Sequence, residues 1–220
     1  MTRTKLKLRK LPDYTAGEEC MNMVTHIVGG AMGIGILIAC LLRAKSAVGF
    51  AGSLIYALAL ISVYAVSSVY HGLRPSTGKK VMQVVDHCMI YMLIAGTYTP
   101  ILLCAFVPAY PTIGWGLLAW QWGLAALAVT LTAIDLRKYR VFSMICYIGM
   151  GWSILPFIPQ TIQLLENAGF AYLLAGGIAY TVGAIIFGIG CKVRWMHSVF
   201  HIFVILGSAL QAITVIWFVL

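Results

Sequence analysis

The sequence predicts an all-α membrane protein, a seven-transmembrane helix bundle with its N-terminus in the cytoplasm and its C-terminus outside. Three observations predict this class: an apolar composition, a series of long apolar stretches, and an uneven placement of Lys and Arg. Of the 220 residues, 61% are hydrophobic and only 10% are charged, whereas an ordinary soluble domain has about 25% charged residues. No soluble domain fits into this chain, so its chemistry must take place in the membrane or at its faces.

Seven apolar stretches are long enough to cross a bilayer, which takes about 20 residues in an α-helix. They cover residues 24–42, 48–71, 84–107, 112–134, 141–163, 170–190 and 195–219. Proline should kink the third stretch at Pro100 and the fifth at Pro156 and Pro159, because proline cannot donate the helical hydrogen bond. The basic and polar residues 1–15 should be disordered or lie on the membrane surface, which leaves residues 16–220 as the transmembrane domain.

The positive charges fall almost entirely on one side of the predicted bundle. Thirteen of the 15 Lys and Arg residues precede the first stretch or lie in the second, fourth and sixth connections, and the other two are Arg43 and Lys45. Positively charged connections stay in the cytoplasm, so an odd number of passes puts Leu220 outside. Topology therefore accounts for the net charge of +9 without nucleic-acid binding, and the pattern suits the inner (plasma) membrane of a bacterium.

Two histidines four residues apart, His197 and His201, are the most informative feature of the chain. On a helix this spacing puts both imidazoles on one face, one turn apart, and ionisable groups inside a membrane helix are usually functional. His71 ends the second apolar stretch and Asp86 begins the third. With the predicted topology, these four side chains lie at one level near the cytoplasmic face, as do the other two histidines.

Three neutral imidazoles and one water form a common open zinc site, and His71, His197 and His201 supply that number of ligands. Zinc lowers the pKa of a bound water to near 7, which suits hydrolysis. Asp86 would accept a proton from that water or orient a ligand, and Ser67, one turn before His71, could hydrogen-bond Asp86, water or substrate. The alternative is a hydrogen-bonded polar cluster that joins helices or relays protons.

Other residues are expected at the same level, and the sequence leaves their roles open. Glu19, Asn22 and His26 share one helical face, where helix capping and helix–helix hydrogen bonds explain them as well as catalysis does. His87 faces either the site or the membrane interface, and we do not assign it as a ligand. Three cysteines near this face are further candidate ligands, although small apolar side chains in a packed bundle are the simpler interpretation. They are Cys20, Cys88 and Cys191.

The polar residues belong to segments that together resemble the signature of one family. The segments are Glu18-Glu19 with Asn22 and Thr25-His26, Ser67 to His71, Asp86-His87 followed by Ile94 to Pro100, and His197 with His201. They resemble the haemolysin III family, the bacterial branch of the progestin and adipoQ receptor (PAQR) superfamily. The resemblance extends from about Glu18 to the last helix, and no key position departs from the pattern.

The resemblance implies a fold like that of the adiponectin receptors, with seven helices and a zinc ion near the cytoplasmic side. It implies that His71, His197 and His201 hold the zinc, that Asp86 contacts it through water, and that Ser67 supports the site. Eukaryotic relatives are linked to ceramidase-like activity, and bacterial members to haemolysis and to membrane-lipid homeostasis. A fold carries over between relatives more readily than a function does.

Three functions are therefore open. The first is a zinc-dependent hydrolase of a lipid amide or ester in membrane-lipid homeostasis, whose partners are membrane lipids and whose bundle holds a lipid amide or free fatty acid. The second is a non-enzymatic sensor of lipids or membrane fluidity with structural zinc. The third is cytolytic activity, although a polytopic chain cannot readily leave its own membrane as a released toxin.

Overall fold

Helices make up the structure, as predicted. The computed structural model describes residue 4, residues 6–190 and residues 193–220, and this part of the chain contains no strand. Its longer helices are α1 (Ala16–Arg43), α2 (Ala47–Gly72), α3 (Thr77–Pro100), α5 (Pro111–Ile134), α6 (Arg140–Gly151), α7 (Ile158–Gly190) and α8 (Met196–Thr214). Short helical segments join or extend them: η1 (Leu6–Leu8), η2 (Ile101–Phe106), α4 (Val107–Ala109), η3 (Leu155–Phe157) and η4 (Val215–Val219).

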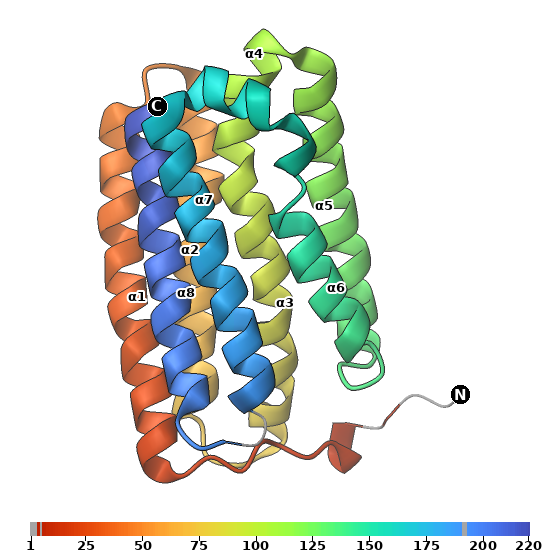
Figure 1. Ribbon diagram of the computed structural model, residues 1–220. Helices are drawn as coiled ribbons and strands as arrows, with labels where there is room; N and C mark the ends of the chain where they lie inside the picture. The colour runs from red at the N-terminus through yellow and green to blue at the C-terminus, as the bar shows by residue number, and fades with distance from the viewer. Residues whose placement is uncertain (1–3, 5, 191–192) are drawn as a thin grey trace.

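The longer helices stand side by side along a common axis (Figure 1). α2 packs against α1 and α3, while α8 packs against α1 and α7. On the other side of the bundle, α3 packs against α5 and α6. α1 begins at one end, here called the N-terminal end, and Leu220 lies at the opposite end (Figure 1). The last turn of α2 therefore lies at the same end as the first turns of α1, α3 and α8.

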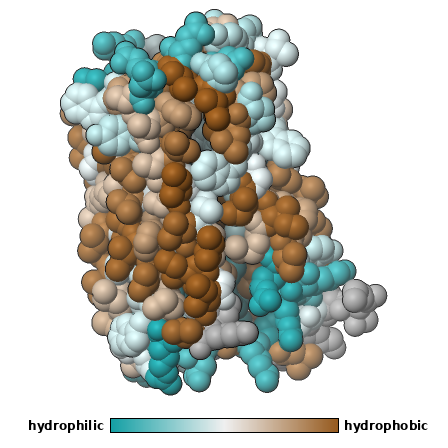
Figure 2. Space-filling model, viewed as in Figure 1, coloured by the Kyte–Doolittle hydropathy of each residue, from teal (hydrophilic) through white to brown (hydrophobic). Residues whose placement is uncertain are grey.

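Six segments of the described chain are long and apolar enough to cross a membrane. They are Ala16–Arg43, Ala47–Gly72, Thr77–Ala109, Pro111–Ile134, Arg140–Gly190 and Met196–Val219. Large apolar side chains are exposed on their outer faces, among them Val28, Leu58 and Ile185, and Figure 2 shows apolar side chains over much of the visible face. Monomeric soluble proteins rarely expose apolar patches of this extent, so the surface is that of a membrane protein.

The fifth of these segments combines two of the predicted stretches. It contains 51 residues, Arg140–Gly190, and the chain runs along the bundle in α6, crosses its far end and returns in α7 (Figure 1). Within α7, Glu166 has a left-handed backbone conformation with φ 59°, which interrupts the helix. The sequence has seven apolar stretches, whereas the described chain has six continuous apolar helical segments. The numbers differ because the turn that joins the fifth and sixth stretches at the far end is itself largely helical.

The break between α6 and α7 leaves carbonyl groups that need hydrogen-bond donors within the membrane. Pro156, one of the prolines predicted to kink this stretch, lies in η3 at the break. The carbonyl of Met150 accepts a hydrogen bond of 2.9 Å from Nε2 of Gln121, and the carbonyl of Gly151 accepts one of 2.7 Å from the Tyr98 hydroxyl. Polar side chains of α5 and α3 thus stabilise the end of α6.

Helix ends differ from those predicted by counting apolar residues. α1 begins at Ala16 instead of residue 24 because Thr15 and Glu18 form a capping box. The Thr15 hydroxyl accepts from the Glu18 backbone N–H (3.2 Å), and the Glu18 carboxylate accepts from the Thr15 backbone N–H (2.9 Å), which satisfies two free donors of the first turn. At the predicted kink, Pro100 ends α3 and the chain continues as the π-helix η2.

The residues before α1 also differ from the prediction. The Thr4 backbone N–H donates to the Asp135 carboxylate (2.8 Å), and the Arg9 guanidinium donates to the carbonyl of Ile134 (3.2 Å). Between them, η1 contacts α3. The described part of this segment therefore packs against the N-terminal end of the bundle instead of being disordered.

Candidate metal centre

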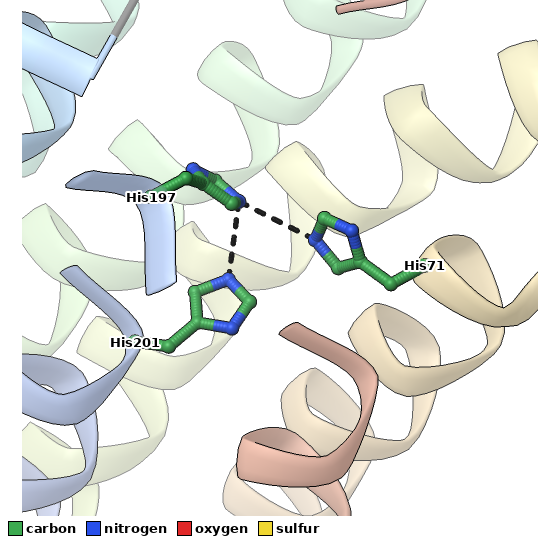
Figure 3. Close-up of side chains that lie close together, drawn as sticks. All are labelled: His71, His197 and His201. Atoms are coloured by element: carbon green, nitrogen blue, oxygen red, sulfur yellow. Dashed lines mark hydrogen bonds between the residues drawn. The ribbon is translucent and has the colours of Figure 1, made fainter. Parts of the chain in front are cut away.

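The three histidines selected from the sequence come together at the N-terminal end of the bundle. His71 lies in the last turn of α2, and His197 and His201 lie in the first two turns of α8. Nε2 of His197 is 3.3 Å from Nε2 of His71 and 3.1 Å from Nε2 of His201 (Figure 3). His71 and His201 are buried and His197 is partly buried. We call these three residues the histidine trio.

The spacing of these nitrogens fits a tetrahedral metal ion. With Zn–N bonds of 2.0–2.1 Å, two ligands of a tetrahedral zinc lie about 3.3 Å apart, close to the 3.3 and 3.1 Å separations in the trio. Among the described residues, the trio is the only group of three or more His, Cys, Asp or Glu side chains whose ligand atoms converge in this way. Nitrogen lone pairs at this distance need a shared proton or a cation between them, so the arrangement suits a bound cation.

A carboxylate from α1 orients His71. Oε2 of Glu19 lies 2.7 Å from Nδ1 of His71, and Oε1 of Glu19 accepts from the Lys79 ammonium at 2.6 Å. Lys79 is held in turn by the carbonyl of Leu73 at 2.8 Å. Because an ionised carboxylate can only accept, the proton of His71 lies on Nδ1 and leaves the Nε2 lone pair for a metal. The structure thus gives Glu19, whose role was open, a direct contact with a candidate ligand.

A backbone carbonyl of the same helix orients His201. Nδ1 of His201 is 3.2 Å from the carbonyl oxygen of Asn22 and 3.2 Å from the Thr25 hydroxyl. A carbonyl can only accept, so Nδ1 carries the proton and Nε2 is free to bind a metal. The Asn22 side chain also accepts a hydrogen bond of 2.6 Å from the Ser198 hydroxyl. Asn22 therefore joins α1 to the helix that carries two of the three histidines.

Aromatic rings hold the third histidine. Tyr14 stacks on His197 with the ring centroids 5.1 Å apart and the planes 24° apart. Phe187 and Phe200 contact the same imidazole at 5.7 and 5.5 Å between centroids. Among the described residues, no hydrogen bond engages Nδ1 of His197. Tyr14 was not selected from the sequence because it precedes the apolar region and tyrosine is not among the usual zinc ligands.

The two remaining histidines stay outside the trio. His26 stacks on His201 with the centroids 3.6 Å apart and the planes 11° apart, and the ring of Tyr64 meets His26 at 5.0 Å in an edge contact. Nδ1 of His87 donates to the carbonyl of Gln83 at 2.8 Å. Both histidines are therefore neighbours of the site, and neither converges with the candidate ligands.

The candidate cysteine ligands do not join the trio either. Cys20 is exposed to the outside of the bundle. The thiol of Cys88 is directed at the carbonyl of Val129, with 3.8 Å between sulfur and oxygen. Cys191 lies outside the described residues.

An apolar cavity adjoins the histidine trio. At the N-terminal end its wall includes His197, His201, Asp86 and Ser67, and the rest is mostly apolar side chains of α3, α6, α7 and α8. Along α8 the lining continues as far as Gln211, which corresponds to about 21 Å at 1.5 Å of helix rise per residue. Because α6 packs on α3 and α5 while α7 packs chiefly on α8, the cavity lies between two groups of helices. Its shape and lining suit a long acyl chain.

Asp86 reaches this cavity from the first half of α3. Its Oδ2 atom lies 3.8 Å from Nδ1 of His87, and its side chain is 15% exposed. Ser67, one turn before His71 on α2, is buried on the same wall. No hydrogen bond among the described residues joins Asp86 to the trio. The two residues predicted to take part in chemistry therefore line the same cavity as His197 and His201, and in the described part of the chain no side-chain hydrogen bond joins either of them to the trio.

Comparison with known proteins shows similarity over nearly the whole chain. The model of the haemolysin III-related family matches residues 14–212. The chain belongs to the haemolysin III-related family. It is 36% identical over 206 residues to hemolysin-3 of Bacillus cereus, which covers 92% of both chains. It is 32% identical over 208 residues to the hemolysin-3 homolog of Bacillus subtilis (strain 168), covering 93% of this chain and 96% of the relative.

A more distant relative supports the wider superfamily. The monocyte to macrophage differentiation factor of Homo sapiens is 28% identical over 165 residues, covering 71% of this chain and 66% of that protein. The resemblance found in the sequence is therefore confirmed. The range matched by the family begins at Tyr14, which stacks on His197, and includes the whole histidine trio.

Proposed function

We propose that this haemolysin III-related protein is a zinc-dependent hydrolase of a lipid amide or ester that acts in membrane-lipid homeostasis. The convergence of three Nε2 atoms at the end of a long apolar cavity carries this proposal. Bound zinc supplies a Lewis acid at that point. The cavity would hold the acyl chain of a membrane lipid, a lipid amide or a free fatty acid, with its polar end next to the trio.

Each residue of the site has a separate role in this proposal. His71, His197 and His201 would hold the zinc through Nε2, which leaves a fourth position for water. Asp86 would accept the proton of the attacking water, since its carboxylate lies on the wall of the cavity that His197 and His201 also line. Ser67 would donate a hydrogen bond to Asp86 or to the polar end of the substrate.

We also propose seven passes through the inner (plasma) membrane of a bacterium, with a cytoplasmic N-terminus and Leu220 outside. The return of the chain in α7 supports two passes within Arg140–Gly190. The opposite positions of Leu220 and the start of α1 fit an odd number of passes. The Lys and Arg residues fall mainly at the N-terminal end, as a cytoplasmic face requires, and Bacillus relatives fit a bacterial membrane.

The zinc content of the protein purified in detergent tests the metal centre. We expect about one zinc per chain in the wild type, because three neutral imidazoles form a common zinc site. His71→Ala, His197→Ala and His201→Ala should each lose it. His87→Ala is the matched control, because His87 lies at the same end of the bundle without joining the trio, and it should keep the metal. A folded wild type without metal, or loss of zinc only in His87→Ala, contradicts the proposed site.

Turnover of lipid amides and esters by the zinc-loaded protein tests the chemistry. Asp86→Asn should keep its zinc and lose at least about 100-fold in rate, the usual contribution of a general base. A screen of both lipid classes in which zinc-loaded wild type turns over none of them would contradict a hydrolase.

The contacts that join helices at the site favour a second candidate, a sensor of lipids or membrane fluidity with structural zinc. Glu19 links α1 to His71 on α2, and Asn22 links α1 to α8. Zinc would add a link between α2 and α8, so that a shift in packing could carry a signal. In cells, a sensor predicts that Asp86→Asn keeps the response to altered membrane lipids while His201→Ala abolishes it, whereas a hydrolase predicts loss in both.

The names of the Bacillus relatives keep cytolysis as a third candidate. Dye release from vesicles that contain a few protein molecules each separates a specific pore from damage by excess protein. Release that scales with the number of protein-containing vesicles would favour a pore. Release only at high protein density would favour damage.

A further inference from the structure

The described residues before α1 cross the N-terminal end of the bundle, and we call residue 4 and residues 6–15 the strap. Figure 1 shows the strap running from near the connection between α5 and α6 to the first turn of α1, beneath the ends of the other helices. η1 contacts α3 on the way. The strap therefore lies over the end of the bundle where the histidine trio is found.

The far end of the strap is anchored on the connection between α5 and α6. The Thr4 backbone N–H donates to Oδ2 of Asp135 at 2.8 Å. Oδ1 of Asp135 accepts from two backbone N–H groups of the following turn at 3.1 and 3.2 Å, so the carboxylate is fixed in place. Arg9 is buried, only 8% exposed, and its guanidinium donates to the carbonyl of Ile134 at 3.2 Å.

The near end of the strap is tied to the start of α8. Thr15 caps α1 together with Glu18, whose Oε1 atom also accepts from the backbone N–H of Trp195 at 2.7 Å. Trp195 immediately precedes α8 and has a left-handed backbone conformation, φ 66°, which few residues other than glycine adopt. One carboxylate thus holds together the end of the strap and the turn that leads to His197.

Tyr14 lies between these two anchors, against the trio. Its ring stacks on His197 at 5.1 Å and 24°, and its centroid is 5.9 Å from that of His71. Glu19 orients His71 and the carbonyl of Asn22 orients His201, and both partners belong to α1. His197 differs, because the ring stacked on it belongs to the strap.

We propose that Tyr14 is a positioning residue of the metal centre and that the strap is a cover that holds Tyr14 against His197. This inference rests on the proposed zinc site. If the strap were displaced, the imidazole ring of His197 would lose the ring stacked on it, whereas His71 and His201 would keep their partners on α1. It would also open the metal to the aqueous phase on that side, so strap position would control both the geometry of the centre and the access of water-soluble molecules to it.

Metal exchange tests the role of Tyr14. In the purified full-length protein, Tyr14→Ala should speed the extraction of zinc by a water-soluble chelator about tenfold, the lower end of the effect of losing an orienting partner of a ligand. The visible absorption bands of the cobalt-substituted protein should change shape, because they depend on ligand geometry. Tyr14→Phe keeps the stacked ring and should restore both readouts. Tyr139→Ala, in the connection between α5 and α6, is the matched tyrosine control.

Trypsin tests the strap without reference to the metal. Cleavage after Lys10 requires the strap to leave the bundle, because neighbouring Arg9 is buried. Asp135→Asn weakens the anchor, since a neutral amide accepts hydrogen bonds less strongly than a carboxylate, and should speed cleavage about tenfold. Asp13→Asn removes a carboxylate from an exposed position of the strap and should leave the rate unchanged.

The outcomes separate the two proposals. A zinc-free wild type overturns the proposed function, and the positioning role of Tyr14 falls with it. A zinc-loaded wild type whose extraction rate and cobalt spectrum match those of Tyr14→Ala overturns the positioning role alone. Equal cleavage of the wild type and Asp135→Asn overturns the anchored cover, whatever the metal content.

Discussion

Each histidine of the trio is oriented by a different kind of partner: a carboxylate, a backbone carbonyl or an aromatic ring. The convergence of the three histidines could be predicted, because the predicted topology brings them to one end of the bundle. Their partners could not. Glu19 and His71 are 52 residues apart in the chain, and their contact depends on how α1 is rotated about its own axis. Tyr14 depends on a segment that composition alone predicts to be disordered.

Glu19→Gln should weaken zinc binding while leaving the trio intact. An amide accepts a weaker hydrogen bond from His71 and loses its charge interaction with Lys79, so the imidazole becomes less basic and less firmly oriented. We expect the dissociation constant for zinc to rise about 10- to 100-fold, measured by competition with a chelator of known affinity. Glu166→Gln is the control at an exposed glutamate of α7. Equal affinities of wild type and Glu19→Gln would exclude Glu19 as the orienting group.

The anchor of the strap should respond to acid. Hydrogen bonds from backbone N–H groups, led by that of Thr4, lower the pKa of Asp135 to about 2 from an ordinary value of about 3.9. A group whose pKa is lowered on attachment stabilises the attached state above its ordinary pKa, and the effect is lost as the pH falls through the lowered value. Two other carboxyl groups, those of Asp13 and Glu18, lie on the strap or at its near end, so the Asp135→Asn variant is needed to assign the transition to Asp135. The strap should therefore stay attached above about pH 4 and detach toward about pH 2.

A spin label on the strap measures this transition. Asp13→Cys provides an exposed attachment site, in a background with all six native cysteines replaced by serine because Cys20 is exposed and Cys104 partly exposed. The mobility of the label should rise as the pH falls from about 4 to about 2. With Asp135→Asn added, the label should be mobile at every pH, and a pH profile that is unaffected by this change would assign the transition to another group.

At the scale of helices, apolar patterning located the six segments of the described chain that are long and apolar enough to cross a membrane, but misjudged their ends. α1 extends past the charged Glu18 and Glu19 because helix ends follow capping residues such as Thr15 rather than the limit of apolar sequence. Pro100 was expected to kink a helix, and at this residue the chain changes to π-helical geometry, which the sequence did not predict. Those outcomes depend on which hydrogen bonds neighbouring helices can offer, which a single stretch of sequence does not contain.

Close helix contact at Gly96 should be essential for packing of α3 on α2. A Cβ atom on Gly96 would lie 2.6 Å from the Cβ of Ala59 and 3.4 Å from the carbonyl oxygen of Ile55, so the two helices would have to separate. Gly96→Ala should lower the free energy of unfolding by about 1–3 kcal/mol, measured by denaturation in detergent micelles. A Cβ on Gly123 of α5 meets no atom within 4 Å, so Gly123→Ala is the control and should be neutral or slightly stabilising.

At the scale of the whole molecule, the position of the site follows from the arrangement of the helices in two groups. One group contains α1, α2, α3, α7 and α8, and the other contains α5 and α6, which attach through α3. The apolar cavity lies where α6 and α7 do not pack closely, and His197 and His201 of the trio line its N-terminal end. An acyl chain could therefore approach from the side of the bundle while water approaches from the end covered by the strap. This separation suits a reaction between a lipid and water.

That arrangement depends on which end of the bundle faces the cytoplasm, and thiol labelling can determine it. In a background with all six native cysteines replaced by serine, we would place single cysteines at Lys45, at Arg74, and directly after Leu220. Lys45 and Arg74 are exposed and lie in consecutive connections. Positive connections stay inside, so a membrane-impermeant thiol reagent applied to intact spheroplasts should label the cysteines at Lys45 and after Leu220, and label Arg74→Cys only after permeabilisation. Labelling of Arg74→Cys alone would show that the topology is the reverse of the proposed one, with the strap and the histidine trio at the outer face. Protection of the C-terminal cysteine together with labelling at Lys45 would mean an even number of passes, and α6 and α7 would then form a re-entrant pair.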